Sequence, residues 1–168
     1  KKQVQPQQQG ADSHNAKLIH SLQLVKAITT ANGWPMSKLE ALCEMLLSIS
    51  RTTEQYLVIA AFDVFESIFK GISAQEDGPK LLVILDSIFD LKPSVNDQHL
   101  VPAWLAVIAQ ATQSYAEIEP RDAFLKLPKI FKVVVQFLDS ESSTIHVSAT
   151  QCLVALCSTA IMPENLLL

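Results

Sequence analysis

The stretch QYLVIAAFDVFESIF, residues 55–69, decides the fold, because its apolar pattern returns later in the chain. Its apolar residues follow one another at steps of four, four and three, which places their side chains on one face of an α-helix. A shift of 88 residues carries this face onto residues 145–156, and half that shift, 44 residues, carries its first three positions onto residues 101–109. The matched residues are Leu57, Ala61, Phe65 and Ile68, then Ile145, Ala149, Leu153 and Leu156, and at half the shift Val101, Leu105 and Ala109.

The preceding segment obeys the same shift. A displacement of 88 residues carries Leu39, Leu42, Cys43, Leu46 and Leu47 onto Leu127, Ile130, Phe131, Val134 and Val135. The repeating unit is therefore a helix pair of 44 residues, within the range of about 40–47 that HEAT and armadillo repeats occupy. Each pair buries too little surface to fold alone, so neighbouring pairs stack on a shared core. We predict an all-α, HEAT/armadillo-like α-solenoid of antiparallel helix pairs, with about three and a half repeats.

Capping signals and turn residues give the expected element boundaries. Residues 1–12 are polar and Gln-rich, which predicts a flexible tail before a repeat segment at residues 13–168 that belongs to a longer solenoid. Ser37 with Glu40, and Thr52 with Gln55, have the spacing of capping boxes, and Pro128 interrupts the sixth helix. We expect helices at residues 13–31, 37–50, 52–69, 79–90, 97–117, 120–138 and 142–161.

The connector FDLKPSVND, residues 89–97, joins two of these helices. Pro93 is expected to stop the first helix, and Asn96 or Asp97 to cap the second. In the last repeat, His146 stands where HEAT sequences usually have Arg, and Ser142 and Ser143 replace the usual Asp of the preceding turn. We expect these departures to weaken the polar contacts between repeats, and we expect His146 to form hydrogen bonds within the protein.

The composition excludes several classes of protein. Hydrophobic residues make up 49% and charged residues 18% of the 168 residues, which is far from a disordered composition. The formal net charge of −4 lacks the basic excess of a nucleic-acid-binding domain, so any contact with RNA is local. Residues 98–116 and 142–163 carry no charge, but their Ser, Thr, Gln and His residues favour buried helices over membrane spans.

No catalytic centre is expected. The chain has three cysteines and no CxxC motif, which is typical of free thiols in a reducing compartment. Cys43 and Cys152 lie on apolar helical faces, where a thiol usually serves as a small core residue. Neither a zinc-ligand spacing nor a glycine-rich phosphate loop occurs. We therefore predict a protein that is not an enzyme and has no cofactor, metal or small-molecule substrate.

One basic stripe is the best candidate for a binding site. Lys126, Lys129 and Lys132 recur every three residues, and Arg121 lies one to two turns before them. On a helix this spacing forms a stripe that drifts slowly around one side. Such a stripe serves either as an ordinary solvated face or as a contact for phosphate or an acidic partner.

Two segments resemble one known family. FDLKPSVNDQHLVPAWLAVIAQA, residues 89–111, and KLPKIFKVVVQFLDSESSTIHVSATQCLVAL, residues 126–156, are similar to the HEAT-repeat region of the ribosomal RNA-processing protein twelve family. The resemblance implies a nuclear and nucleolar protein, shuttling to the cytoplasm, that joins small-subunit precursor particles and acts in pre-rRNA processing and subunit export. It implies binding to pre-rRNA and to other assembly factors, and it implies no catalytic residue.

Three functions follow from these patterns. The leading hypothesis is a non-catalytic scaffold in ribosome biogenesis that binds protein and RNA and has no membrane partner. The first alternative is another HEAT-repeat carrier, such as an importin-like transport receptor. The second alternative is an enzyme that uses Cys43 or Cys152 as its nucleophile.

Overall fold

The computed structural model describes residues 6–72 and 83–159, and the described residues form an all-α helical solenoid. No β-strand occurs in these two ranges, in agreement with the predicted fold class. The helices are α1 (Pro6–Thr30), α2 (Leu39–Ser50), α3 (Gln55–Ile72), α5 (Val83–Phe89), α6 (Leu100–Ile118), α7 (Pro120–Val135) and α8 (Ser143–Thr159), with 3₁₀ turns at η1 (Met36–Lys38) and η2 (Gln136–Asp139).

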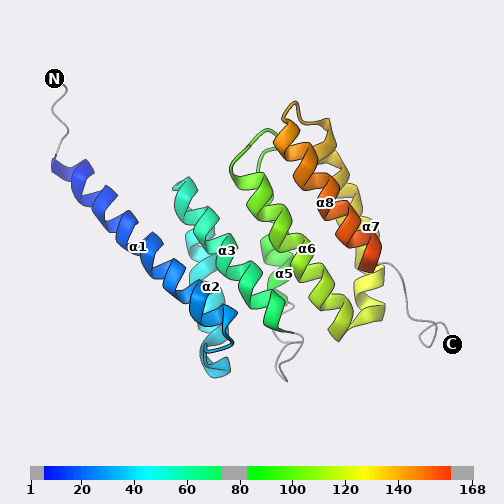
Figure 1. Ribbon diagram of the computed structural model, residues 1–168, viewed down its shortest axis with the longest axis horizontal. Coiled ribbons are helices and arrows are strands. Elements are labelled where there is room, and N and C mark those ends of the chain that lie inside the picture. Colours follow the sequence, from blue (N-terminus) through cyan, green and yellow to red (C-terminus); the bar gives the residue numbers. More distant parts are fainter. Residues whose placement is uncertain (1–5, 73–82, 160–168) are drawn as a thin grey trace.

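The helices stack in two layers (Figure 1). Helices α1, α3, α6 and α8 lie side by side in the front layer, and α2, α5 and α7 lie behind them. Each rear helix precedes its front partner in the chain, so α2/α3, α5/α6 and α7/α8 are three successive pairs, and α1 stands alone at one end. The predicted count of three and a half repeats is the count that the described residues form.

Burial follows the period of 44 residues through all three pairs. Four equivalent positions in α3, α6 and α8 face the core, and all twelve side chains are buried. At the predicted third position, Phe65 is fully buried, while Ala109 and Leu153 are partly buried and pack against the core beside the buried Ile108 and Cys152. The four sets are Leu57, Val101 and Ile145, then Ala61, Leu105 and Ala149, then Val64, Ile108 and Cys152, and finally Ile68, Thr112 and Leu156.

Trp104 is the centre of the packing between the second and third pairs. Its side chain is fully buried, and its ring centroid lies 5.9 Å from that of Phe89 and 5.7 Å from that of Phe137. The indole Nε1 donates a hydrogen bond of 2.9 Å to the carbonyl oxygen of Ile88 at the end of α5. A buried indole N–H needs such an acceptor, so Trp104 joins α5, α6 and η2 by both packing and hydrogen bonding.

The turn after α1 has the expected form. Asn32 has a φ of 54°, in the left-handed region where Asn and Gly are tolerated best. The backbone N–H of Gly33 donates to the carbonyl oxygen of Ile28 at 2.9 Å, which satisfies one of the free acceptors of the helix end. The predicted end of the first helix near residue 31 is therefore confirmed.

The start of the first helix differs from the prediction. Helix α1 begins at Pro6 rather than near Ser13, so part of the predicted polar tail is helical. The described side chains of residues 10–14 are exposed, so this helical end has no buried face for the sequence pattern to reveal. Residues 1–5 lie outside the described residues, and the flexibility of residues 1–12 stays a prediction. The predicted beginning of the fourth helix, residues 79–82, also lies outside them.

Neither predicted capping box forms. The chain enters α2 through the 3₁₀ turn η1, so Ser37 lies inside a helical turn, and no side chain caps either element. The Thr52 hydroxyl donates to the carbonyl oxygen of Ile49 instead, and α3 begins at Gln55. Both predictions are wrong because a capping box requires its Ser or Thr to stand at the non-helical N-cap position.

Pro128 does not interrupt α7. The helix runs without a break from Pro120 to Val135 and ends in the 3₁₀ turn η2. A proline removes one N–H from the helix ladder. Pro128 is exposed, so water can satisfy the carbonyl that loses its partner. Pro120 stands at the first helical position, where a proline is favoured.

Candidate partner-binding surface

The predicted basic stripe lies along α7, in the rear layer. Arg121, Lys129 and Lys132 are exposed, and Lys126 is partly buried. The spacing of three to five residues along one helix keeps these four side chains on the outward half of α7. The structure therefore places all four predicted residues on one helix, with three of them open to solvent.

Two of the lysines also contact neighbouring helices. Lys126 Nζ lies 3.6 Å from Asp86 Oδ2 and 5.2 Å from the centre of the Tyr115 ring. Lys129 Nζ lies 5.3 Å from the centre of the Phe89 ring. Because Asp86 and Phe89 both belong to α5, these contacts turn one edge of the stripe toward the preceding helix pair.

The ion pair contributes little to stability. Lys126 is 35% exposed and Asp86 67% exposed, so water and salt screen their attraction. The ion pair matters more for the charge of the stripe, because the Asp86 carboxylate offsets the positive charge of Lys126. The potential of the stripe therefore depends mainly on Arg121, Lys129 and Lys132.

A further cation, Lys92, reaches this layer from the connector between α5 and α6. Its Nζ donates to Gln136 Oε1 at 3.2 Å and lies 6.0 Å from the centre of the Phe137 ring. The stripe drawn from the sequence did not include Lys92, because it lies in another repeat. The sequence could have indicated this contact, because Lys92 and Gln136 are 44 residues apart and therefore occupy equivalent positions of successive repeats.

Polar side chains also link successive repeats at the turns. Asp97 Oδ1 accepts from the backbone N–H of His99 and of Leu100, at 3.1 Å and 2.9 Å, and from Gln55 Nε2 of the preceding pair at 3.2 Å. The prediction that Asn96 or Asp97 caps the fifth helix is thus confirmed for Asp97. Asn96 instead accepts a hydrogen bond of 3.1 Å from the Ser140 hydroxyl of the next repeat.

In the last repeat, different residues form the polar contacts at the turn. The His146 ring Nε2 hydrogen-bonds to the carbonyl oxygen of Ser140, which confirms the predicted hydrogen-bonding role of His146. The Ser140 hydroxyl also accepts from the backbone N–H of Ser142 at 3.2 Å. We expected the absence of the usual Asp to weaken the contacts between repeats, but Ser140 supplies a contact to Asn96 in its place.

The cysteines differ sharply in environment. Cys43 and Cys152 are buried, and Cys157 is exposed. Burial raises the pKa of the Cys43 thiol to about 12, with a smaller contribution from the nearby Glu40 carboxylate. Burial alone raises the pKa of the Cys152 thiol to about 12. Both thiols therefore stay protonated at neutral pH, whereas a nucleophilic cysteine needs a thiolate.

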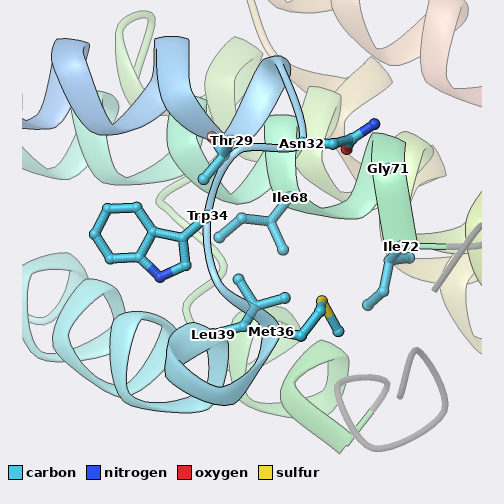
Figure 2. A pocket seen from close by; sticks show the side chains of 8 residues that line it. All are labelled: Thr29, Asn32, Trp34, Met36, Leu39, Ile68, Gly71 and Ile72. Carbon is cyan, nitrogen blue, oxygen red and sulfur yellow. The ribbon is translucent and has the colours of Figure 1, made fainter. Parts of the chain in front are cut away.

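A small pocket lies beneath the turn that joins α1 to α2 (Figure 2). Trp34, Met36, Ile68 and Ile72 line it, and it holds about 30 Å³. The Trp34 Nε1 is buried and has no hydrogen-bond partner among the described residues. Trp34 packs where the α1–α2 turn meets α3.

The described residues hold neither a grouped set of metal ligands nor a membrane-spanning helix. Within residues 6–72 and 83–159, no three His, Cys, Asp or Glu side chains are grouped so that they could hold a metal ion. None of the helices in these ranges combines the length and the apolar character that a membrane crossing requires.

Comparison with known proteins places the chain in a family. It is 37% identical over 158 residues to "Ribosomal RNA-processing protein 12" of Saccharomyces cerevisiae, a match that covers 91% of this chain and 13% of the relative. The chain belongs to the ribosomal RNA-processing protein 12 family. This finding confirms the resemblance drawn from residues 89–111 and 126–156.

Two more distant relatives of the family match over similar stretches. "Putative ribosomal RNA-processing protein 12" of Schizosaccharomyces pombe is 25% identical over 84% of this chain and 12% of the relative. "RRP12-like protein" of Homo sapiens is 24% identical over 92% of this chain and 12% of the relative. The chain therefore spans only a small part of the length of each relative. No family model and no solved structure matches the chain.

Proposed function

We propose that this chain is a non-catalytic scaffold segment of a ribosome-biogenesis factor. It acts in the nucleus and nucleolus, within small-subunit precursor particles, during pre-rRNA processing and subunit export, and it shuttles to the cytoplasm. The observation that carries the proposal is the match of 91% of the chain to a relative named for ribosomal RNA processing. The two-layer stack supports a scaffold role, because such repeats present an extended surface to partners.

We propose that the segment forms part of a longer HEAT-class solenoid. Cys43 and Leu47 on α2 are buried. The residues 88 positions later on α7 are not: Phe131 is partly exposed and Val135 is exposed. Helix α5 follows α2 in the rear layer, whereas no described helix follows α7. The exposed apolar side of α7 therefore has the shape and chemistry of a face that receives another helix pair.

Burial of the thiols argues against the cysteine-dependent enzyme. The raised pKa values of Cys43 and Cys152 keep both groups in the unreactive form. The names of the relatives, which refer to ribosomal RNA processing, favour ribosome biogenesis over an importin-like carrier. Affinity purification of the full-length protein separates these two functions. Recovery of pre-rRNA with small-subunit assembly factors supports the proposal, and recovery of transport cargo with a small GTPase refutes it.

The basic stripe on α7 is the proposed contact with RNA. Arg121, Lys129 and Lys132 are exposed cations on one helix, and each phosphate that such a cation neutralises releases a counterion. The net charge of −4 makes a general attraction to RNA unfavourable, so a contact depends on this local patch.

Neutralising the stripe tests this contact. The Arg121→Gln, Lys129→Gln and Lys132→Gln substitutions together, made in the full-length protein, should reduce crosslinking to pre-rRNA within the native particle. The matched control removes three exposed lysines elsewhere, with Lys17→Gln, Lys26→Gln and Lys38→Gln. A crosslinking map that is the same for the stripe variant as for the unmodified protein contradicts the RNA contact while leaving the scaffold role intact.

A further inference from the structure

The front layer contains a groove between α6 and α8 that differs in chemistry from the basic stripe. The two helices lie side by side in Figure 1, and the hollow over their contact is open to solvent and holds about 200 Å³. This volume is below the range of about 300–1,000 Å³ of small-molecule pockets. It is suited to one or two anchoring side chains of a larger partner.

The walls of the groove are unusually free of charge. Helix α8 has no Asp, Glu, Lys or Arg along its length, and α6 has none before Glu117. The outward face of a surface helix normally carries charged residues. On α8, Val147 is 56% exposed and Val154 62% exposed, and they lie four residues before and three residues after Gln151, which lines the groove. Exposed apolar side chains next to a hollow are typical of an interaction site.

Small side chains and amide groups both line the groove. Ala106 and Ala109 on α6 leave space for a larger apolar side chain, while Gln110 and Gln113 on α6 and Gln151 on α8 bring amide groups from both walls. A glutamine amide has both donors and acceptors, so it can pair with the backbone N–H and C=O of an extended chain. A helical partner would already have satisfied these backbone groups internally.

The only charge among the lining residues is Glu66, at the edge contributed by α3. Glu66 is partly buried, and its carboxylate disfavours a phosphate backbone while it attracts an ammonium or guanidinium group. We propose that the α6/α8 groove binds an extended protein segment that inserts an apolar side chain over Ala106 and Ala109 and pairs a Lys or Arg with Glu66. This site is separate from the RNA contact proposed on the rear layer and does not depend on it.

The partner can be found by site-specific photocrosslinking in the full-length protein. A photoreactive amino acid at Gln151, within the groove, is compared with one at Ala27, an exposed position on α1. The expected product is a protein segment in which an apolar residue lies close to a Lys or Arg. Crosslinking at Gln151 to RNA alone, to a second copy of this protein alone, or to no more than Ala27 captures overturns the proposal.

A synthetic peptide that copies the crosslinked stretch then tests the chemistry on the purified chain. The Ala106→Met change fills the space over Ala106, and the Glu66→Lys change reverses the charge at position 66. Each change should weaken peptide binding by about tenfold or more, which corresponds to about 1.4 kcal/mol. The control is Ala27→Met, which adds the same side chain at an exposed helical position on α1 and should leave affinity unchanged.

Circular dichroism of each variant separates loss of binding from loss of folding, because Ala106 and Glu66 are only partly buried and both replacements are good helix formers. A variant that keeps its helical signal and still binds the peptide with unchanged affinity refutes the assigned groove. A Glu66→Gln variant provides a second charge test at nearly constant shape. Its affinity should fall less than that of Glu66→Lys, and equal affinity for all three side chains at position 66 contradicts the proposed ion pair.

Discussion

Replacement of Trp104 by phenylalanine should destabilise the stack far more than the same replacement at Trp34. Trp104 is fully buried between two repeats and donates to the carbonyl oxygen of Ile88. Trp34 is only partly buried, and its Nε1 has no partner among the described residues. The two Trp→Phe changes therefore remove the same atoms from two different environments.

The magnitude follows from three contributions at Trp104. Loss of the indole hydrogen bond costs about 0.5–1.5 kcal/mol, at the lower end because the Ile88 carbonyl also accepts from the backbone N–H of Leu91 at 3.0 Å. The phenyl ring buries roughly 40 Å² less surface, which costs about 1 kcal/mol at 25 cal/mol per Å². The space left between Phe89 and Phe137 adds up to about 1 kcal/mol. We expect a total of about 1.5–2.5 kcal/mol.

Urea unfolding followed by far-UV circular dichroism measures this difference, since the fluorescence signal itself changes when a tryptophan is lost. Trp34→Phe should cost less than about 1 kcal/mol, because it removes no hydrogen bond and little buried area. Equal losses of unfolding free energy at Trp104 and Trp34 would refute the reasoning. So would a loss below about 0.5 kcal/mol at Trp104, because it would mean that the observed hydrogen bond and packing do not control stability.

Four further outcomes are expected. Asn32→Ala should cost about 1 kcal/mol in urea unfolding because Ala tolerates the φ of 54° less well than Asn does, whereas Asn32→Gly should be close to neutral. Asp97→Ala should cost about 1–2 kcal/mol, because two N–H groups at the start of α6 and the Gln55 amide lose their acceptor, and a midpoint within error of the unmodified chain would contradict this. In thiol titration of the native chain at pH 8, Cys157 should react alone, while Cys43 and Cys152, with pKa values raised to about 12, should react only after unfolding. Between pH 9 and 12 these two thiols ionise in the unfolded chain, where a thiol has its ordinary pKa of 9.0, but stay protonated in the folded chain. The free energy of unfolding should therefore fall as the pH rises from 9 toward 12.

The repeat could be predicted from the sequence because the same burial recurs in each pair. Leu57, Val101 and Ile145 meet the same apolar environment in three successive repeats, so the requirement for an apolar residue recurs every 44 residues. The start of α1 could not be predicted in this way. Its described side chains near Ala11 are exposed, and a helical end without a buried face leaves no period in the sequence.

The candidate sites, too, could be predicted from the sequence only in part. The four cations on α7 were visible as a spacing within one helix, and the structure keeps them on that helix. The contact of Lys126 with Asp86 was not visible, because it depends on how closely α5 lies to α7. The α6/α8 groove was missed for a related reason. Its uncharged helices were interpreted as wholly buried, whereas Val147 and Val154 are exposed.

The polar contacts between repeats account for a feature that apolar packing leaves undetermined. Apolar faces of stacked helices accept more than one register at similar cost, since burial is non-directional. Lys92 with Gln136, and Asn96 with Ser140, are pairs in which each partner is displaced by 44 residues from the other. Hydrogen bonds between equivalent positions form only when one repeat is set directly upon the next, and a slip by one helical turn would break both. The apolar period thus drives stacking, and these polar pairs favour the register in which the repeats stack.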